Sequence, residues 1–93
     1  MISRVEFAKG VIKELRLVPK HVAVKLKSWV ELVEMSGLAT ARKIPGYLDE
    51  PLQAARVGQR SIRLSRSYRA FYKIQRMGSN DIVLVCEVNK HDY

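Results

Sequence analysis

Cysteine is nearly absent from this sequence, and long apolar runs are missing altogether. Cys86 is the only cysteine, so the chain cannot form an internal disulfide, and we expect a reducing cytoplasm as its location. No apolar run approaches the roughly 18 residues that a membrane-spanning helix requires. The start of the chain carries the charges of Arg4, Glu6 and Lys9 where a signal peptide would be apolar. We therefore expect a cytoplasmic protein with no membrane partner.

Acidic residues are missing from a long part of the chain. The 93 residues carry a formal charge of +8, from 17 Lys and Arg against nine Asp and Glu. Between Pro51 and Asn80 there are seven basic residues and no acidic one, so this charge cannot be neutralised locally. A field of this strength on a small surface favours polyanionic partners such as a nucleic acid or an acidic protein. A hydrophobic content of 47% argues against disorder, and the length predicts one domain over residues 1–93.

Metal-ligand patterns and phosphate-binding loops are also lacking. Two histidines and one cysteine have no spacing that suits a metal ion, and no glycine-rich phosphate loop occurs. We expect no metal site and no cofactor. In their place we expect His21 to be exposed at the start of a helix and Trp29 to lie in the core.

Hydrophobic periodicity predicts one strand and two helices in the first half of the chain. Alternating side chains over residues 2–7 suit a short strand. Apolar residues at helical spacing predict a helix over 8–17, and Pro19 opens a second helix that ends near Gly37. Both helices have an apolar stripe that requires a sheet to cover it.

The second half of the chain predicts a loop and three strands. Residues 44–59 hold two prolines and two glycines with little periodicity, which predicts a long loop, and loops of this length often carry function. Strands are expected over 60–64, 68–75 and 81–89. The order β-α-α-β-β-β is typical of an α+β domain, in which an N-terminal helix hairpin packs on one face of a twisted, mainly antiparallel sheet.

Two residues of the last strand have structural expectations. Cys86 lies among apolar residues and has no suitably spaced partner, so we expect it to be buried. Glu87 is expected to share a sheet face with Val83 and Val85, and to form an ion pair with the basic strands.

The segment GQRSIRLSRSYRAFYKI, residues 58–74, has an arginine at every third position. Alternation along two strands turns its aliphatic side chains towards the helices. The opposite side, which we call the open face, is then expected to hold Arg63, Arg69, Phe71 and Lys73, with Arg60 and Arg66 flanking it at the strand ends. Cations for phosphates and a ring for an unstacked base are what RNA binding requires. The alternative is a solvated face whose arginines only maintain solubility.

Two stretches of the chain resemble a known family. SIRLSRSYRAFYKI (61–74) and IVLVCEVNKHDY (82–93) are together similar to the RelE/ParE superfamily of bacterial toxins, and most of all to its RelE/HigB ribonuclease branch. The resemblance implies a RelE-like fold and a toxin of a type II toxin–antitoxin pair. Such toxins enter the ribosomal A site and cut mRNA without a metal. The implied partners are the ribosome with its mRNA, and a cognate antitoxin that is acidic or carries an acidic segment.

The resemblance also implies roles for individual residues. Arg69 matches the arginine of the family's YR strand motif, which stabilises the scissile phosphate, and Arg63 matches a basic residue on the preceding strand. His91 stands where relatives have a general acid, while Asp92 and Tyr93 match the terminal acid and tyrosine of HigB-like members. The chemistry agrees, because attack by the ribose 2′-OH requires one proton taken, one proton given and positive charge at the phosphate.

Three functions therefore remain open at this point. The first is a ribosome-dependent endoribonuclease, the second a ParE-like gyrase poison and the third a non-catalytic RNA-binding module. The basic strands followed by His-Asp-Tyr favour the ribonuclease, since a gyrase poison has no need of a proton-transfer cluster. The expected RNA contacts are Arg60, Arg66, Phe71, Lys73 and Lys90.

Overall fold

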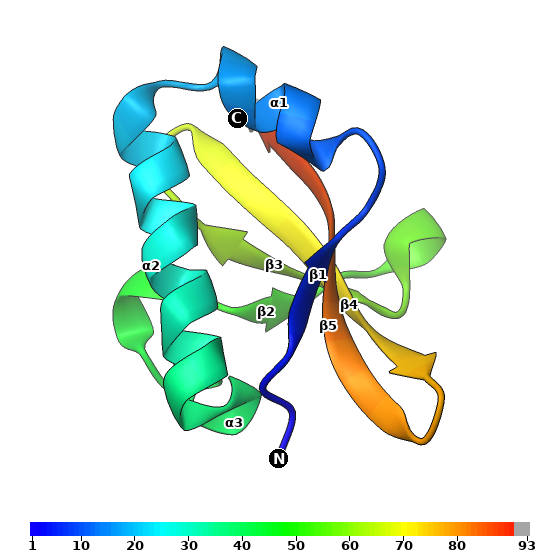
Figure 1. The fold of residues 1–93 in the computed structure, drawn as a ribbon. Coiled ribbons are helices and arrows are strands. Elements are labelled where there is room, and N and C mark those ends of the chain that lie inside the picture. The colour runs from blue at the N-terminus through cyan, green and yellow to red at the C-terminus, as the bar shows by residue number, and fades with distance from the viewer. Residues whose placement is uncertain (91–93) are drawn as a thin grey trace.

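The computed structural model describes residues 1–90, in which five strands form a single sheet (Figure 1). They are β1 (Val5–Phe7), β2 (Glu50–Pro51), β3 (Gln59–Arg63), β4 (Tyr68–Met77) and β5 (Asn80–Lys90). Their order in the sheet is β1-β5-β4-β3-β2. β1 runs parallel to β5, and every other neighbouring pair is antiparallel.

Three helices, α1 (Val11–Leu17), α2 (Lys20–Ser36) and α3 (Leu38–Arg42), pack against this sheet (Figure 1). Pro19 precedes α2, as its fixed φ allows at a helix start. Gly37 separates α2 from α3 with a φ of 88°, a conformation that favours glycine. The predicted α+β architecture, with helices over a twisted and mainly antiparallel sheet, is confirmed.

The core lies between α2 and the central strands. Trp29 is fully buried, and its ring lies 5.1 Å from the ring of Tyr72 on β4. His21 is exposed at the start of α2. The expectations for both Trp29 and His21 are thus confirmed. No helix within residues 1–90 has the length and hydropathy that crossing a membrane requires.

The segment predicted as one long loop contains regular pieces. Two short 3₁₀ helices, η1 (Pro45–Tyr47) and η2 (Ala54–Arg56), lie on either side of β2. β2 is a two-residue strand at the edge of the sheet, where a proline can sit because no further strand needs a backbone donor from it. The prediction of a loop without elements was wrong, because pieces of two or three residues leave no period in the sequence.

A β-bulge in β5 changes which side chains share a face. Tyr72 of β4 pairs with Val85, whereas its neighbour Phe71 pairs with Glu87, so Cys86 is an extra residue on β5. Glu87 therefore lies on the open face rather than beside Val85, which is buried against the helices. Cys86 is half-buried rather than buried. Both expectations for this part of the last strand were wrong, because each assumed unbroken alternation.

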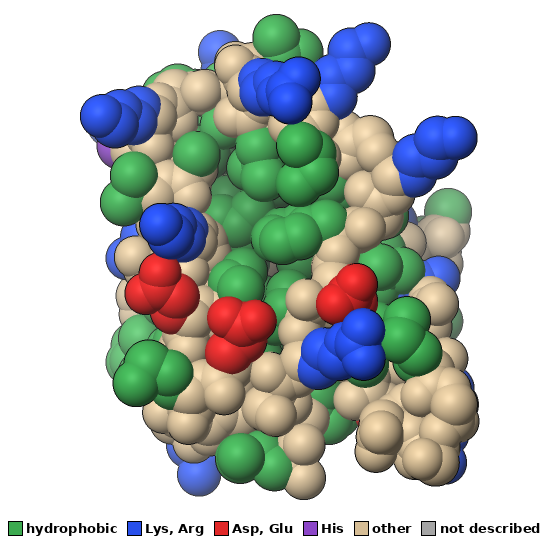
Figure 2. All heavy atoms as spheres, viewed as in Figure 1, with side chains coloured by type: hydrophobic (Ala, Val, Ile, Leu, Met, Phe, Trp, Pro, Cys, Tyr) green, Lys and Arg blue, Asp and Glu red, His purple; other side chains and the backbone are tan. Residues whose placement is uncertain are grey.

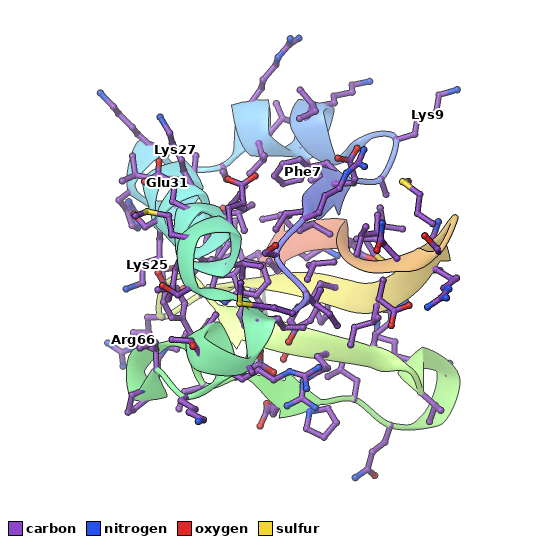
Figure 3. The ribbon with its side chains drawn as sticks, turned by 60° about the horizontal axis from the view of Figure 1, so that its bottom comes forward. Phe7, Lys9, Lys25, Lys27, Glu31 and Arg66 are labelled. Carbon is purple, nitrogen blue, oxygen red and sulfur yellow. The ribbon has the colours of Figure 1, made fainter. Side chains whose placement is uncertain are left out.

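A small apolar hollow lies on the helix side, between α1, α2 and β1. Its volume is about 160 Å³, and its lining consists of Phe7, Leu15, Ala23, Leu26, Lys27 and Val30. Figure 2 shows apolar side chains gathered at this place, with charged side chains around them. Figure 3 shows Phe7 beneath α1, and Lys27 close to Glu31 on α2. The molecule thus presents an apolar concavity on its helix side.

Candidate nucleic-acid interface

The open face is formed by β3, β4 and β5 on the side opposite the helices. Arg63 pairs across the strands with Arg69, and Ser61 pairs with Phe71. The opposite side of β3 and β4 carries the buried residues Ile62, Leu64, Ala70 and Tyr72. Because side chains alternate along a strand, Arg63, Arg69 and Phe71 share the open face as predicted. Their roles in RNA binding stay predictions.

Arg69 is firmly held and nearly buried on the open face. Only 14% of its side chain is exposed. Its Nη1 donates to Ser61 Oγ (3.1 Å) and to Glu50 Oε1 (3.3 Å). Its Nε is buried and has no hydrogen-bond partner within residues 1–90. The guanidinium is therefore held in place with one buried donor unsatisfied by the described residues.

Arg63 lies directly opposite Arg69 in the register of β3 and β4, so two basic residues share one cross-strand position. Its Nε donates to the backbone oxygen of Ser65 at 3.3 Å. Within residues 1–90, Arg63 takes part in none of the five ion pairs. Like charges in directly opposed positions repel. An anion that contacted both arginines would relieve that repulsion.

Phe71 does not present a bare ring, because Arg56 of η2 covers it. The guanidinium carbon of Arg56 lies 4.3 Å from the centre of the Phe71 ring. Nη2 of Arg56 donates to both carboxylate oxygens of Glu87 (3.1 Å each), and Nη1 donates to Gln59 Oε1 (3.1 Å). The expected ion pair of Glu87 therefore exists, but its partner comes from the segment before β3 and not from the basic strands.

Arg60 lies on the helix side, and the expectation that it flanks the open face was wrong. Its register partner is Tyr72, which is fully buried there. Arg60 Nε donates to Asp49 Oδ1 at 2.6 Å, and the Asp49 side chain is completely buried. The Tyr72 hydroxyl donates to the other oxygen of Asp49 and accepts from Arg42 Nε. Burial, together with the bond to Asp49, raises the pKa of Tyr72 to about 12.

Of the other predicted contacts, Lys73 lies on the open face as predicted, two residues after Phe71 on β4. Lys73 is exposed on β4 opposite Gln59, and Arg66 is exposed in the turn between β3 and β4, where it points away from the sheet (Figure 3). Lys90 ends β5 and pairs with Tyr68. This position belongs to the helix side of the sheet and not to the open face. Burial raises the pKa of the Cys86 thiol, although nearby Lys73 opposes that effect. The predicted residues His91, Asp92 and Tyr93 lie outside the described residues.

Glu50 contacts Arg69 on the open face, and the sequence analysis did not name it. It is 58% exposed at the side-chain level and contacts Arg69 from the neighbouring edge strand. The sequence held one indication of its importance, because Asp49 and Glu50 are the only acidic residues between Glu34 and Asp81. A carboxylate next to an arginine has the chemistry of a proton acceptor beside a cation. Within residues 1–90, no three His, Cys, Asp or Glu side chains cluster as a metal site does.

Comparisons with known proteins place this geometry in a known fold. A scan against protein-family models and a search of curated proteins find no match. The YoeB/ParE toxin from Agrobacterium tumefaciens is 15% identical, with a TM-score of 0.69 over 96% of this chain and 99% of that chain. YafQ from E. coli strain BL21(DE3) is 20% identical, with a TM-score of 0.72 over 92% of this chain and 90% of that chain.

The archaeal RelE–RelB complex from Pyrococcus horikoshii OT3 also matches, at 18% identity and a TM-score of 0.69 over 97% of this chain and 96% of that chain. The chain therefore shares the fold of these three solved structures, with helices on one mostly antiparallel sheet. The fold that the sequence resemblance implied is confirmed.

Proposed function

We propose that the chain is the toxin of a type II toxin–antitoxin pair, and that it cleaves mRNA in the ribosomal A site. The observation that carries this proposal is Arg69, which is fixed by Ser61 and Glu50 beside Arg63 and keeps an unsatisfied Nε. A preorganised cation of this kind stabilises a phosphate that gains negative charge in the transition state. The likeness in fold to YoeB, YafQ and RelE supports the same conclusion.

The proposed reaction uses the RNA's own 2′-OH and needs no metal. Glu50 takes the proton of the 2′-OH, whose oxygen then attacks the adjacent phosphorus. Arg69 and Arg63 hold the non-bridging oxygens with charge-assisted hydrogen bonds. The bond to the 5′-oxygen breaks, and a general acid from His91, Asp92 or Tyr93 gives that oxygen its proton. The products are a 2′,3′-cyclic phosphate and a free 5′-hydroxyl.

The proposed location is the cytoplasm, and the proposed partner is an antitoxin with an acidic segment. RelE and YafQ occur in complexes with RelB and DinJ. No lysine within residues 1–90 takes part in an ion pair, so the lysine charge of the helix side is available to a partner. The apolar hollow beside Lys27 supports lasting contact with an apolar side chain of that partner. Association should slow as salt rises; salt-independent association would count against it.

The test is expression of the wild type and of Arg69→Ala, with mapping of new mRNA 5′ ends and an assay of gyrase supercoiling. We expect A-site cleavage by the wild type and a loss on the order of 100-fold or more in Arg69→Ala. Arg76→Ala is the matched control, because Arg76 also pairs with a carboxylate (Asp81, 3.3 Å) but lies at the far end of β4. Inhibited gyrase with intact mRNA would support the ParE-like alternative. Ribosome binding without cleavage would support the RNA-binding module.

A further inference from the structure

Arg56 is held flat by residues from three strands. Phe71 of β4 lies under its guanidinium at 4.3 Å, Glu87 of β5 accepts two hydrogen bonds of 3.1 Å, and Gln59 of β3 accepts one of 3.1 Å. A surface arginine ordinarily samples many rotamers, and ordering it costs conformational entropy. Here that ordering has already taken place, so the guanidinium plane has a fixed position on the open face.

Attachment of the segment that carries Arg56 does not require these contacts. Asp49, from the same segment, is already fixed on the other side of the sheet by Arg60 and by the hydroxyl of Tyr72. An ion pair as exposed as that of Arg56 with Glu87, at 40% and 29%, contributes only about 1 kcal/mol or less. The arrangement therefore calls for a reason beyond stability.

We propose that the outer plane of Arg56 is a binding site for one unstacked RNA base. Phe71 covers the inner plane of the guanidinium, and Glu87 and Gln59 accept hydrogen bonds from N–H groups at its edge. The outer plane is therefore the part that a partner can contact. Guanidinium planes stack on nucleobases as aromatic rings do. Because Glu87 neutralises Arg56, the contact favours a base over a phosphate.

This site rests on the proposed function, whose scissile phosphate binds at Arg69. Phe71 follows Arg69 by two residues on the same strand face, which corresponds to about 7 Å. One nucleotide can span that distance. The base on Arg56 is therefore a neighbour of the phosphate on Arg69, and Arg56 contributes to the choice of nucleotide at the cleavage site.

The experiment measures binding of two single-stranded probes of equal length at low salt. One probe is 2′-O-methyl oligoadenylate, which cannot be cut through a 2′-OH, and the other is the same backbone without bases. We expect Arg56→Ala and Arg56→Lys to lower affinity for the base-bearing probe about 5- to 100-fold, because both lose the planar surface. Neither should change affinity for the abasic probe beyond the small effect of charge. Arg76→Ala should affect both probes equally and weakly.

An equal loss on both probes would make Arg56 a phosphate contact and overturn the inference, as would no loss on either. A wild type that binds both probes alike overturns it too. Circular dichroism checks that each variant is folded, and Phe71→Leu, which removes the ring under Arg56, should reproduce the base-specific loss. Because neither probe can be cleaved, the outcome does not depend on nuclease activity. A wild type that binds bases through Arg56 but leaves mRNA intact would instead refute the proposed function.

Discussion

Asp49 and Glu50 are consecutive carboxylates with opposite environments. Asp49 turns to the helix side, where its side chain is fully buried and lies 2.6 Å from Arg60. Glu50 turns to the open face, where it is 58% exposed and lies 3.3 Å from Arg69. Each therefore pairs with an arginine of the basic segment, but on a different side of the sheet.

The difference lies in the burial of the two carboxylates and not in that of their arginines, because Arg60 is 27% exposed and Arg69 only 14%. The Asp49 carboxylate also accepts from the Tyr72 hydroxyl, so both its oxygens have partners, as a buried charge requires. Glu50 has one long contact in a solvated position, which is worth little to stability. Under the proposed mechanism, it could therefore change partners when a phosphate binds at Arg69.

The largest expected effect is on catalysis at the chain end. Deleting residues 91–93 should abolish cleavage, at least 100-fold, if the general acid lies there as the resemblance implies. The free energy of unfolding should change by less than about 1 kcal/mol, because the buried side chains of β5 end at Val88. The rate of mRNA cleavage on programmed ribosomes measures the effect on catalysis, and urea unfolding measures the effect on stability. A truncated protein that still cleaves at the normal rate would leave Glu50 and the arginines as the whole catalytic apparatus.

Glu50→Gln tests the proposed role of Glu50 as the proton acceptor. We expect cleavage to fall on the order of 100-fold, because an amide keeps the contact with Arg69 but cannot take the 2′-OH proton. Stability should stay within about 1 kcal/mol of the wild type. Single-turnover rates with excess toxin report the chemical step. Wild-type rates in this variant would assign the proton acceptor elsewhere.

Asp49→Asn tests the contribution of the buried Asp49 carboxylate to stability. Removing the buried charge leaves Arg60 without its carboxylate, and we expect a loss of about 2–4 kcal/mol in the free energy of unfolding. Asp81→Asn is the matched control, since the ion pair of Asp81 with Arg76 is exposed, and it should cost less than about 0.5 kcal/mol. Urea unfolding at pH 7 compares the two. Equal, small losses would mean that burial does not distinguish these pairs.

The smallest effect concerns the Tyr72 hydroxyl and its dependence on pH. Tyr72→Phe should cost about 1 kcal/mol at pH 8 through the lost bond to Asp49. The folded-state pKa of Tyr72 is raised from 10.0 to about 12, so its contribution is complete below pH 10. Between pH 10 and 12 the unfolded state loses the proton first, and stability falls. The gap between wild type and variant should therefore narrow over that interval in urea titrations; a gap that widens would contradict the assignment.

Some elements of the site could be anticipated because their signals are local. Arg63, Arg69 and Phe71 were placed together by strand alternation, which depends only on the backbone of neighbouring residues. Trp29 followed from the apolar stripe of α2 in the same way. The open face was therefore predictable in its arginines, although not in how they are held.

Local pattern by itself determined the order of the longer helices and strands, the concentration of positive charge and the face that carries Arg69, but it missed α3, η1, β2 and η2. Tertiary structure alone decided what surrounds that face. The bulge at Cys86 turns Glu87 towards Arg56, and pairing of β2 with β3 separates Asp49 from Glu50. These contacts join residues far apart in the sequence, such as Arg56 and Glu87. Hydrophobic periodicity describes only neighbouring residues, so it cannot predict such contacts. The arginines are visible in the sequence, but the carboxylates that pair with Arg56, Arg60 and Arg69 meet them only in the folded chain.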